Sequence, residues 1–337
     1  MRPTIHSRPA NAKPRGPSAQ RGLTLVELMV SVVLALLVTL AALGALLFSR
    51  QGGAAMEQAT ALRDNGRFAT ELIRRIVAQT GFESFNLNSS LRQGVAPYTV
   101  ASPIPDIEGF NNALVAAAVN PVNAANGSRS GGCGTVTDTS CVNGSDVLIL
   151  RYQGLTDGSM INCSGVPVGD AATAATRPMS AFHVRRNVSG EPTLICTFID
   201  TAGAVKDSEL IEGVESFQVL YGVDSVTPNT ATPSTADDPT LITRYLRADQ
   251  MVVASSVAET QNNWRRVRAI RIGMILRGPV GSAISKVATD LFPLGASFAN
   301  AADASSTFPA PADGRLRQEV TFTVHLRNYQ GQDGAHI

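Results

Sequence analysis

Glu27 is the residue whose type and position most need a chemical explanation. It is the one charged residue between Leu23 and Phe48, and the 21 residues from Leu28 to Phe48 carry no charge. An ionised group in an apolar environment is unfavourable and usually faces a partner, unless it lies near enough to the boundary to reach water. Position alone leaves two interpretations open, a snorkelling carboxylate or one that pairs with a cation.

Four cysteines could form disulfides or hold a metal. An even count is typical of disulfides in an oxidising compartment, and three connectivities are possible. We favour pairing of Cys133 with Cys141 and of Cys163 with Cys196. The first disulfide would close a short loop and stabilise the folded state by about 2–3 kcal/mol. A zinc site is the alternative, and it is disfavoured because the sequence has no C-x-x-C and no histidine at ligand spacing.

The histidines give little support to catalysis. No H-E-x-x-H, G-x-S-x-G or phosphate-loop motif is present. Two of the histidines, His183 and His325, fall on the expected polar faces of strands, and His6 and His336 lie near the two ends of the sequence. We therefore expect no enzymatic activity and no cofactor.

The basic and acidic clusters also have simple interpretations. Arg265, Arg266 and Arg268 beside Trp264 could contact nucleic acid, but we prefer the simpler interpretation that they lie on the wet face of a strand. Charged residues make up only 16% of the chain, which argues against a highly charged nucleic-acid binder. Calcium ligation by Asp224, Asp237 and Asp238 is not supported, because their spacing is not that of an EF-hand.

The 26 residues from Leu23 to Phe48 predict a membrane-spanning helix. About 20 apolar residues at about 1.5 Å each cross a hydrocarbon core of about 30 Å. A cleaved secretory signal is the alternative, but its apolar region has about 7–15 residues and ends in small residues. Here the apolar run continues through Phe48 to Ser49 and Arg50.

The charge distribution predicts the orientation of this helix. Residues 1–22 hold five of the 28 basic residues and no acid, which leaves 23 basic against 27 acidic residues in the rest of the chain. Basic flanks favour the cytoplasm. We therefore expect the N-terminus to be cytoplasmic and the residues beyond 50 to be outside it.

The helical pattern continues past the membrane segment and ends near Thr80-Gly81. Gly52-Gly53 is a weak point that predicts either a junction between two helices or a hinge. An apolar stripe beyond it indicates an amphipathic helix packed on a domain. Its members are Leu62, Phe68, Leu72, Ile73, Ile76 and Val77.

The remaining sequence predicts strands and polar loops. A buried apolar run occupies 147–150, and β-rich or alternating patterns occupy 182–185, 194–199, 214–221, 270–276 and 319–327. Residues 83–143 and 225–240 are rich in loop-forming types. We expect an α+β fold in which a long N-terminal helix, its first half transmembrane, packs on a C-terminal antiparallel β-sheet domain.

The segment Arg21-Gly22-Leu23-Thr24-Leu25-Val26-Glu27 resembles the class III signal of type IV prepilins and pseudopilins. The resemblance implies that prepilin peptidase cuts between Gly22 and Leu23 and that the new amino group of Leu23 is methylated. Glu27 then becomes the fifth residue of the mature chain, and the resemblance implies that it neutralises the N-terminus of an adjacent subunit. The first mature residue is more often Phe in this family.

Further segments are similar to PilW-type minor pilins. The most telling is Leu210–Glu215 followed by Tyr221–Asp224. The others are Asn65–Ala69, Ser145–Leu148, Val267–Arg271 after Trp264, and the closing Leu326-Arg327-Asn328. The resemblance divides the chain into a leader at 1–22, a helix at 23–80 with its membrane span at 23–48, a β-rich domain at 81–330 and a tail at 331–337.

The resemblance implies a structural protein of the type IV pilus that helps to initiate assembly and lies at or near the tip. Implied partners are other minor pilins, the major pilin, prepilin peptidase, the inner-membrane assembly platform, a large tip adhesin and the lipid bilayer. The expected location is the bacterial inner membrane, with the C-terminal domain periplasmic, and then the pilus. The alternatives are a J-type pseudopilin of type II secretion and a membrane-anchored periplasmic enzyme or binding module.

Overall fold

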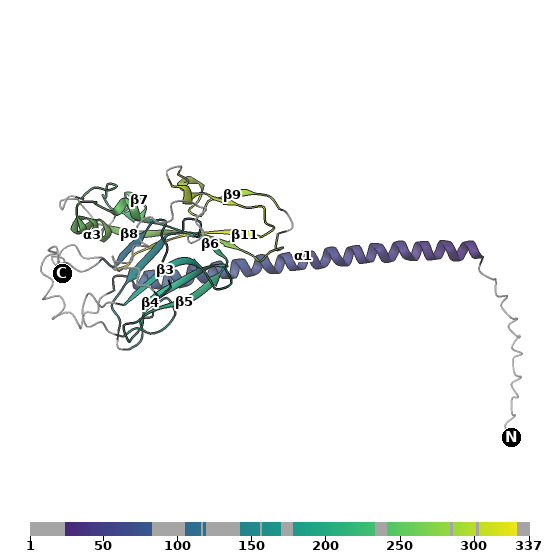
Figure 1. The fold of residues 1–337 in the computed structure, drawn as a ribbon, viewed down its shortest axis with the longest axis horizontal. Coiled ribbons are helices and arrows are strands. Elements are labelled where there is room, and N and C mark those ends of the chain that lie inside the picture. The colour runs from purple at the N-terminus through teal and green to yellow at the C-terminus, as the bar shows by residue number, and fades with distance from the viewer. Residues whose placement is uncertain are drawn as a thin grey trace, which may run out of the picture. The chain divides into compact units, whose positions relative to one another are not determined.

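The computed structural model describes residues 24–82, 105–115, 117–118, 142–155, 157–169, 178–232, 241–283, 286–300 and 303–328. It divides into two compact units, Met1–Gly53 and Ala54–Ile337. The first unit contributes the N-terminal part of one helix, and the second contains the rest of that helix and all the strands (Figure 1).

Helix α1 runs from Leu25 to Gln79 without a break. Thr24 starts it: the Glu27 N–H donates to Thr24 Oγ1 at 3.3 Å, and the Leu28 N–H donates to the Thr24 carbonyl at 3.1 Å. Gly81 follows its end with a φ of 71°, a conformation that suits glycine. The predicted end is therefore confirmed. Gly52-Gly53 does not interrupt the helix, and the boundary between the two units falls there.

The part of α1 in the second unit buries one face. Leu62, Ala69, Ile73 and Ile76 belong to the main hydrophobic core. Phe68 was expected in this stripe but is 54% exposed. Each helical residue is turned by about 100° from its neighbour, so Phe68, directly before the buried Ala69, points to the flank of the helix.

The strands form two antiparallel sheets and a short ribbon. The first sheet has the order β1-β2-β3-β4-β5 and consists of β1 (Ile107–Phe110), β2 (Val147–Arg151), β3 (Met179–Arg186), β4 (Pro192–Ile199) and β5 (Val205–Glu212). The second has the order β11-β8-β6-β7 and consists of β6 (Val214–Val223), β7 (Arg244–Leu246), β8 (Val267–Arg277) and β11 (Arg317–His325). β9 (Thr289–Leu291) and β10 (Phe308–Ala310) form the ribbon.

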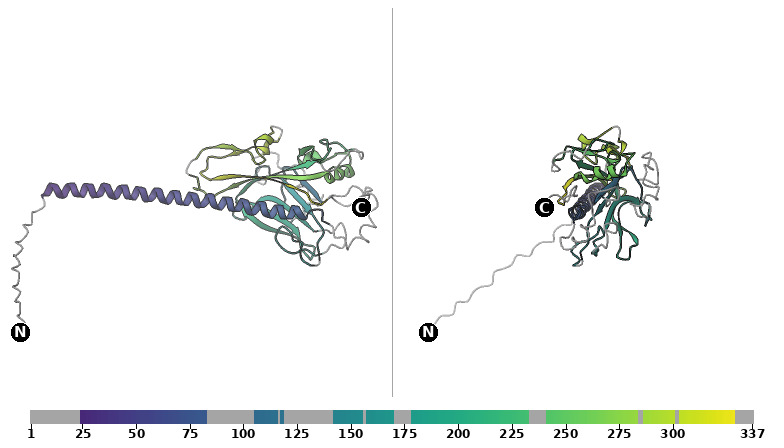
Figure 2. Two further views of the ribbon diagram at one scale, coloured as in Figure 1. Left: turned by 180° about the vertical axis from the view of Figure 1, so that it is seen from behind. Right: turned by 90° about the vertical axis from the view of Figure 1, so that its left-hand side faces the viewer.

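Figures 1 and 2 show the two sheets on opposite sides of the helical segment of the second unit. Side chains of this segment and of both sheets share one core, to which Ile73, Phe182 and Phe217 belong. The α+β fold with an N-terminal helix on antiparallel sheets is thus confirmed. Short helices fill the connections, namely η4 (Ala248–Met251), α3 (Val257–Arg265), η5 (Ala296–Phe298) and η6 (Ala304–Ser306).

The expectation that His183 lies on a wet strand face is wrong. His183 is completely buried, because the face of the first sheet that turns away from the main core is also covered. A second apolar cluster, which includes Ala113, Val115, Ile149 and Ala181, lies on that face. Polar and apolar residues alternate in β3, but neither face of its middle is open to water.

The expectation for the arginine cluster is also wrong for Arg265 and Arg266. Arg265 ends α3 and Arg266 follows it, and both are buried rather than placed on a wet strand. Arg266 Nη1 lies 3.5 Å from Asp224 Oδ2, and Arg268 Nη1 donates to the Arg265 carbonyl at 2.9 Å. Arg265 and Arg266 are therefore internal parts of the domain, whereas Arg268, within β8, is half-buried.

Candidate functional site

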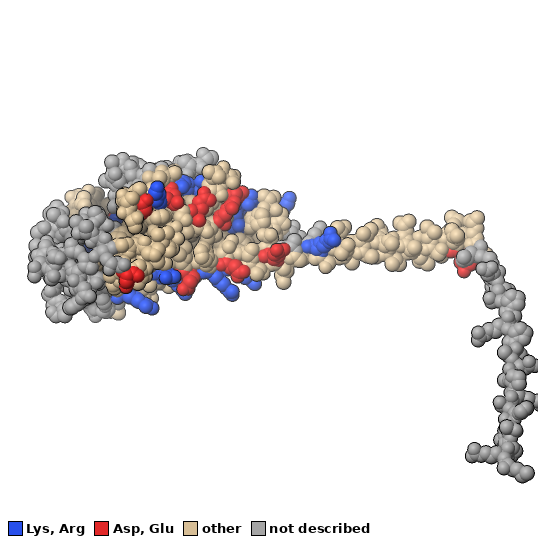
Figure 3. Space-filling model, turned by 90° about the horizontal axis from the view of Figure 1, so that it is seen from below, with Lys and Arg blue, Asp and Glu red and all other residues tan. Residues whose placement is uncertain are grey.

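The exposed surface of α1 in the first unit is the principal candidate site. Its large apolar side chains between Leu25 and Phe48 are 50–81% exposed. Leu25–Arg50 is long and apolar enough to cross a membrane, by length and composition. In the space-filling view this segment lacks charge between its two ends (Figure 3). So large an apolar surface needs lipid or other apolar helices to cover it.

Glu27 lies in the first turn of α1, at the edge of this surface. Its main-chain N–H is bonded to Thr24 Oγ1, and its carboxylate has no ion-pair partner among the described residues. Helix N-termini favour negative charge, so the position suits an ionised carboxylate that is free to meet a cation from another chain. Gly22 and Leu23, the predicted cleavage residues, lie outside the described part.

The predicted disulfide between Cys163 and Cys196 is confirmed. The two Cα atoms are 5.8 Å apart, and the bond ties the segment before β3 to the middle of β4. Closing a loop of this length stabilises a domain by about 3–4 kcal/mol in the chain-entropy model. The other expected pair, Cys133 and Cys141, lies outside the described residues. Within the described ranges no group of three His, Cys, Asp or Glu side chains could hold a metal ion.

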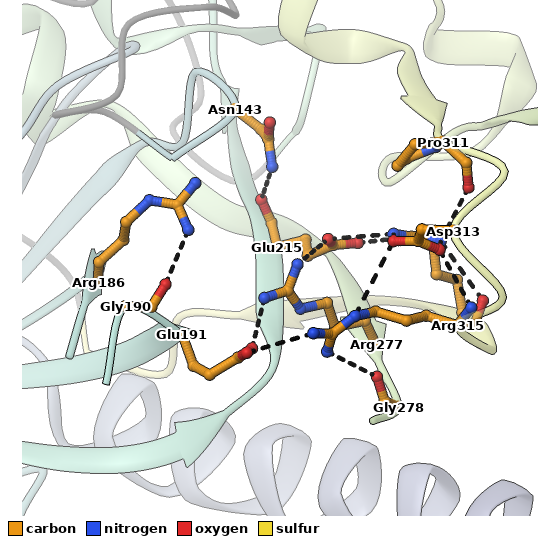
Figure 4. A network of polar contacts seen from close by, with 11 residues as sticks. Asn143, Arg186, Gly190, Glu191, Glu215, Arg277, Gly278, Pro311, Asp313 and Arg315 are labelled. Atoms are coloured by element: carbon orange, nitrogen blue, oxygen red, sulfur yellow. Dashed lines mark hydrogen bonds and ion pairs between the residues drawn. The ribbon is translucent and has the colours of Figure 1, made fainter. Parts of the chain in front are cut away.

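A cluster of ion pairs, centred on Glu215 at the start of β6, joins the two sheets (Figure 4). Glu215 accepts from Arg277 Nη1 at 2.7 Å and from Arg317 Nε at 2.6 Å. Arg277 also pairs with Glu191, in the turn between β3 and β4. Arg315 Nη2 bonds to Glu191 at 3.3 Å, and Arg317 Nη2 bonds to Asp313 at 2.7 Å.

The chemistry of this cluster is structural. The hydrogen bond from Arg317 is the main cause that lowers the pKa of Asp313 to about 2, and that from Arg277 lowers the pKa of Glu191. All three carboxylates accept hydrogen bonds from arginine side chains. The sequence pointed to Leu210–Glu215 as a family-like segment but gave no role to Glu215. Its partners Arg277 and Arg317 are 62 and 102 positions away in the chain, so no local signal could have identified them.

A second internal carboxylate, Asp146, also links the sheets. It accepts from the Asn112 N–H at 2.9 Å and from the Val219 N–H at 2.8 Å, and so joins the end of β1 to β6. Burial raises the pKa of Asp146 to about 8, against the opposing effect of these two hydrogen bonds. In the first sheet, His183 Nε2 lies 2.8 Å from Thr197 Oγ1, and burial lowers the pKa of His183 to about 3.

These two groups predict an unusual pH profile of stability. The raised pKa of Asp146 means that its contribution is complete below about pH 3.8 and is lost as the pH rises toward 8. The lowered pKa of His183 means that its contribution is complete above about pH 6.5 and is lost as the pH falls. We expect the two slopes, each up to about 1.4 kcal/mol per pH unit, to oppose one another between about pH 4.5 and 6.5.

His183→Gln separates the two contributions, because glutamine can still bond to Thr197 but does not titrate. Above pH 6.5 the parent and the variant should lose stability in parallel as the pH rises to 8. Below pH 6.5 the variant should gain more stability than the parent as the pH falls. Urea unfolding of both proteins at a series of pH values measures the difference, and parallel curves below pH 6.5 would show that His183 does not titrate as proposed.

Family models match two parts of this sequence. Residues 17–43 match the prokaryotic N-terminal methylation motif, and residues 181–328 match the family Type IV Pilus-assembly protein W. Among solved structures, the type IV-like pilin TTHA1219 from Thermus thermophilus is similar at 15% identity, with 56% of this chain and 81% of that chain covered and a TM-score of 0.29. No curated protein matches. The methylation motif across the start of α1 and the pilus-assembly family across β3–β11 together support a type IV pilin of the PilW type.

Proposed function

We propose that this chain is a minor pilin that helps to initiate assembly of the type IV pilus and then lies at or near its tip. The observation that carries the proposal is the apolar surface of α1, uncharged from Leu28 to Phe48 and preceded by Glu27 in the first helical turn. Such a helix can be held by a bilayer before assembly and by other apolar helices afterwards. The family matches support a pilus component over an enzyme or a secretion pseudopilin.

The proposed starting point is the inner membrane. The five basic residues in 1–22 favour a cytoplasmic N-terminus, and α1 then places the β domain in the periplasm. The Cys163–Cys196 disulfide is consistent with that oxidising compartment. The proposed partners are other minor pilins, the major pilin, prepilin peptidase, the assembly platform in the inner membrane and a large tip adhesin.

Cleavage between Gly22 and Leu23 prepares the site. It removes the basic leader, keeps the apolar helix and creates an α-ammonium four residues before Glu27. Buried between packed helices, an ammonium and a carboxylate are each tolerated only when paired, and such a pair fixes the register of neighbouring subunits. Glu27 of one subunit therefore forms an ion pair with the α-ammonium of the adjacent subunit.

Processing at this junction is the first expected result. The mature protein should begin at Leu23 with a methylated amine, because the peptidase acts on the Gly22–Leu23 bond. Intact-mass measurement of membrane-extracted protein checks this. Gly22→Ala should be processed in part because a methyl group is small, whereas Gly22→Phe should retain residues 1–22. A full-length parent chain in piliated cells would contradict the proposal.

A further inference from the structure

A groove of about 610 Å³ lies between α1 and β11 within the second unit. Its floor is narrow, because a Cβ atom at Gly66 would come within 2.9 Å of Val320 Cγ2. Side chains alternate between the two faces of a strand. Four consecutive residues of β11 can therefore line the groove together only if the groove runs along the main-chain edge of that strand. The groove is lined by Arg63, Gly66, Arg67, Thr70, Glu71 and Arg74 of α1 and by Gln318–Thr321 of β11.

β11 is an edge strand, and its outer side is free of main-chain partners among the described residues. The Leu326 N–H bonds to the Arg268 carbonyl at 2.9 Å, and the Gly278 N–H bonds to the Leu316 carbonyl at 2.8 Å. Antiparallel pairing alternates from these two bonds along the strand. The N–H and C=O groups of Glu319, Thr321 and Thr323 therefore point away from β8, into the space where another strand could pair.

The other edges of the two sheets are less suited to pairing. β1 has four residues and β7 has three. β5 has eight, but its register with β4 shifts between Leu194 and Ile195, and it carries Lys206, Asp207, Glu209 and Glu212. Short length, irregular register and charge are the usual protections of a sheet edge. β11 has nine residues and pairs with β8 without a register shift.

The helical wall of the groove is basic. Arg63, Arg67 and Arg74 are exposed on one flank of α1, and none of them has an ion pair within the described part of the chain. The groove lining also contains two acidic residues, Glu71 on α1 and Glu319 on β11. The Glu319 carboxylate already accepts a hydrogen bond from the Phe292 N–H at 2.6 Å. Arg63 and Arg67 are separated by about 6 Å along the helix axis. This spacing is similar to the distance between alternate residues of a strand, which is about 6.7 Å.

We propose that this groove binds an extended acidic segment of another protein, which pairs with β11 as a fifth strand of the second sheet. Main-chain bonds to the outer edge of β11 supply the affinity, and carboxylates at two alternate positions face Arg63 and Arg67. The site lies in the second unit and does not depend on cleavage at Gly22 or on Glu27.

The test uses the full-length protein in detergent micelles and a labelled peptide, Thr-Glu-Val-Glu-Val-Thr-Val-Thr, with a counterpart in which lysine replaces both glutamates. Fluorescence anisotropy should show saturable binding of the acidic peptide and at least tenfold weaker binding of the lysine peptide. Arg67→Glu should abolish this preference, because each peptide then meets one attractive and one repulsive side chain at positions 63 and 67. Arg75→Glu is the matched control, because Arg75 is also exposed on α1 but lies outside the groove, and it should leave the preference unchanged.

A second pair of variants tests the main-chain bonds. Thr321→Pro removes an outward N–H of the edge strand, a position where proline is tolerated, and Thr321→Val controls for the lost hydroxyl bond to the Pro293 carbonyl. Circular dichroism confirms that both variants fold. The proline variant should bind the acidic peptide at least tenfold more weakly than the valine variant. No binding, equal binding of the two peptides or equal binding by the two variants would overturn the proposal, as would displacement of the peptide by dimerisation of this chain.

Discussion

Glu27→Gln should leave a processed protein in the membrane that initiates few pili. The substitution keeps the shape of the side chain and removes its charge. Insertion should become easier, by up to about 2–3 kcal/mol at mid-bilayer and less near the interface. Cleavage should persist because the Gly22–Leu23 junction is unchanged. Assembly should be impaired because the ammonium of a neighbouring subunit would be buried without a partner, a loss of about 3–5 kcal/mol if it is fully desolvated.

That loss corresponds to an association constant of the initiating complex about 100-fold lower or more. Pilus counts by electron microscopy and co-purification with other minor pilins measure it. Glu57→Gln is a matched control, since it removes the same charge from an exposed position of α1 outside the apolar segment, and it should leave the pilus count unchanged. If Glu27→Gln cells also keep their pili and complexes, Glu27 is only a carboxylate tolerated at the interface.

The sequence was sufficient to predict the helices and strands that have a clear local pattern of apolar and polar residues. α1 needs no distant partner to be recognised, because its apolar run and its end at Thr80-Gly81 are local features. The alternation of β11 was interpreted correctly because one face of that strand meets the core while Glu319, Thr321 and His325 on the other are exposed. The predicted strands that became β2, β3, β4, β6 and β8 are also confirmed.

The errors arose where burial depends on a second layer. His183 follows the same alternation as β11, but a loop containing Ala113 and Val115 covers its face of the first sheet. No pattern within β3 carries that information. α3 was hidden inside a polar stretch, yet it had a local signal: Ser256 caps the helix and accepts the Glu259 N–H at 3.2 Å, the spacing of a capping box.

The groove and the ion-pair cluster could not have been predicted from one sequence. The groove brings Arg67 to β11, about 250 positions later in the chain. Arg315 and Glu191 are 124 positions apart. Such contacts follow from how the sheets pack, and a charged residue looks the same in the sequence whether it is solvated or paired inside a domain.

Glu215→Ala should have the largest effect on the stability of the β domain. Glu215 is 5% exposed and is the acceptor shared by Arg277 and Arg317, which are 14% and 6% exposed. Removal of one partner from a buried ion pair typically destabilises a protein by about 3–5 kcal/mol. We expect about 3 kcal/mol, because Arg277 keeps Glu191 and Arg317 keeps Asp313. Denaturant unfolding of the full-length protein in micelles, with its disulfide intact, measures the change.

Asp249→Ala is the control for an exposed pair. Asp249 is 48% exposed and bonds to Arg247 at 2.9 Å, so its removal should change stability by at most about 1 kcal/mol. High salt should reduce the small loss of stability caused by Asp249→Ala. It should leave most of the loss caused by Glu215→Ala, because buried ion pairs are weakly screened. Equal losses in the two variants would show that the cluster is no stronger than a surface pair. A loss confined to Glu215→Ala would show that this buried ion-pair cluster stabilises the β domain beyond what a surface pair contributes.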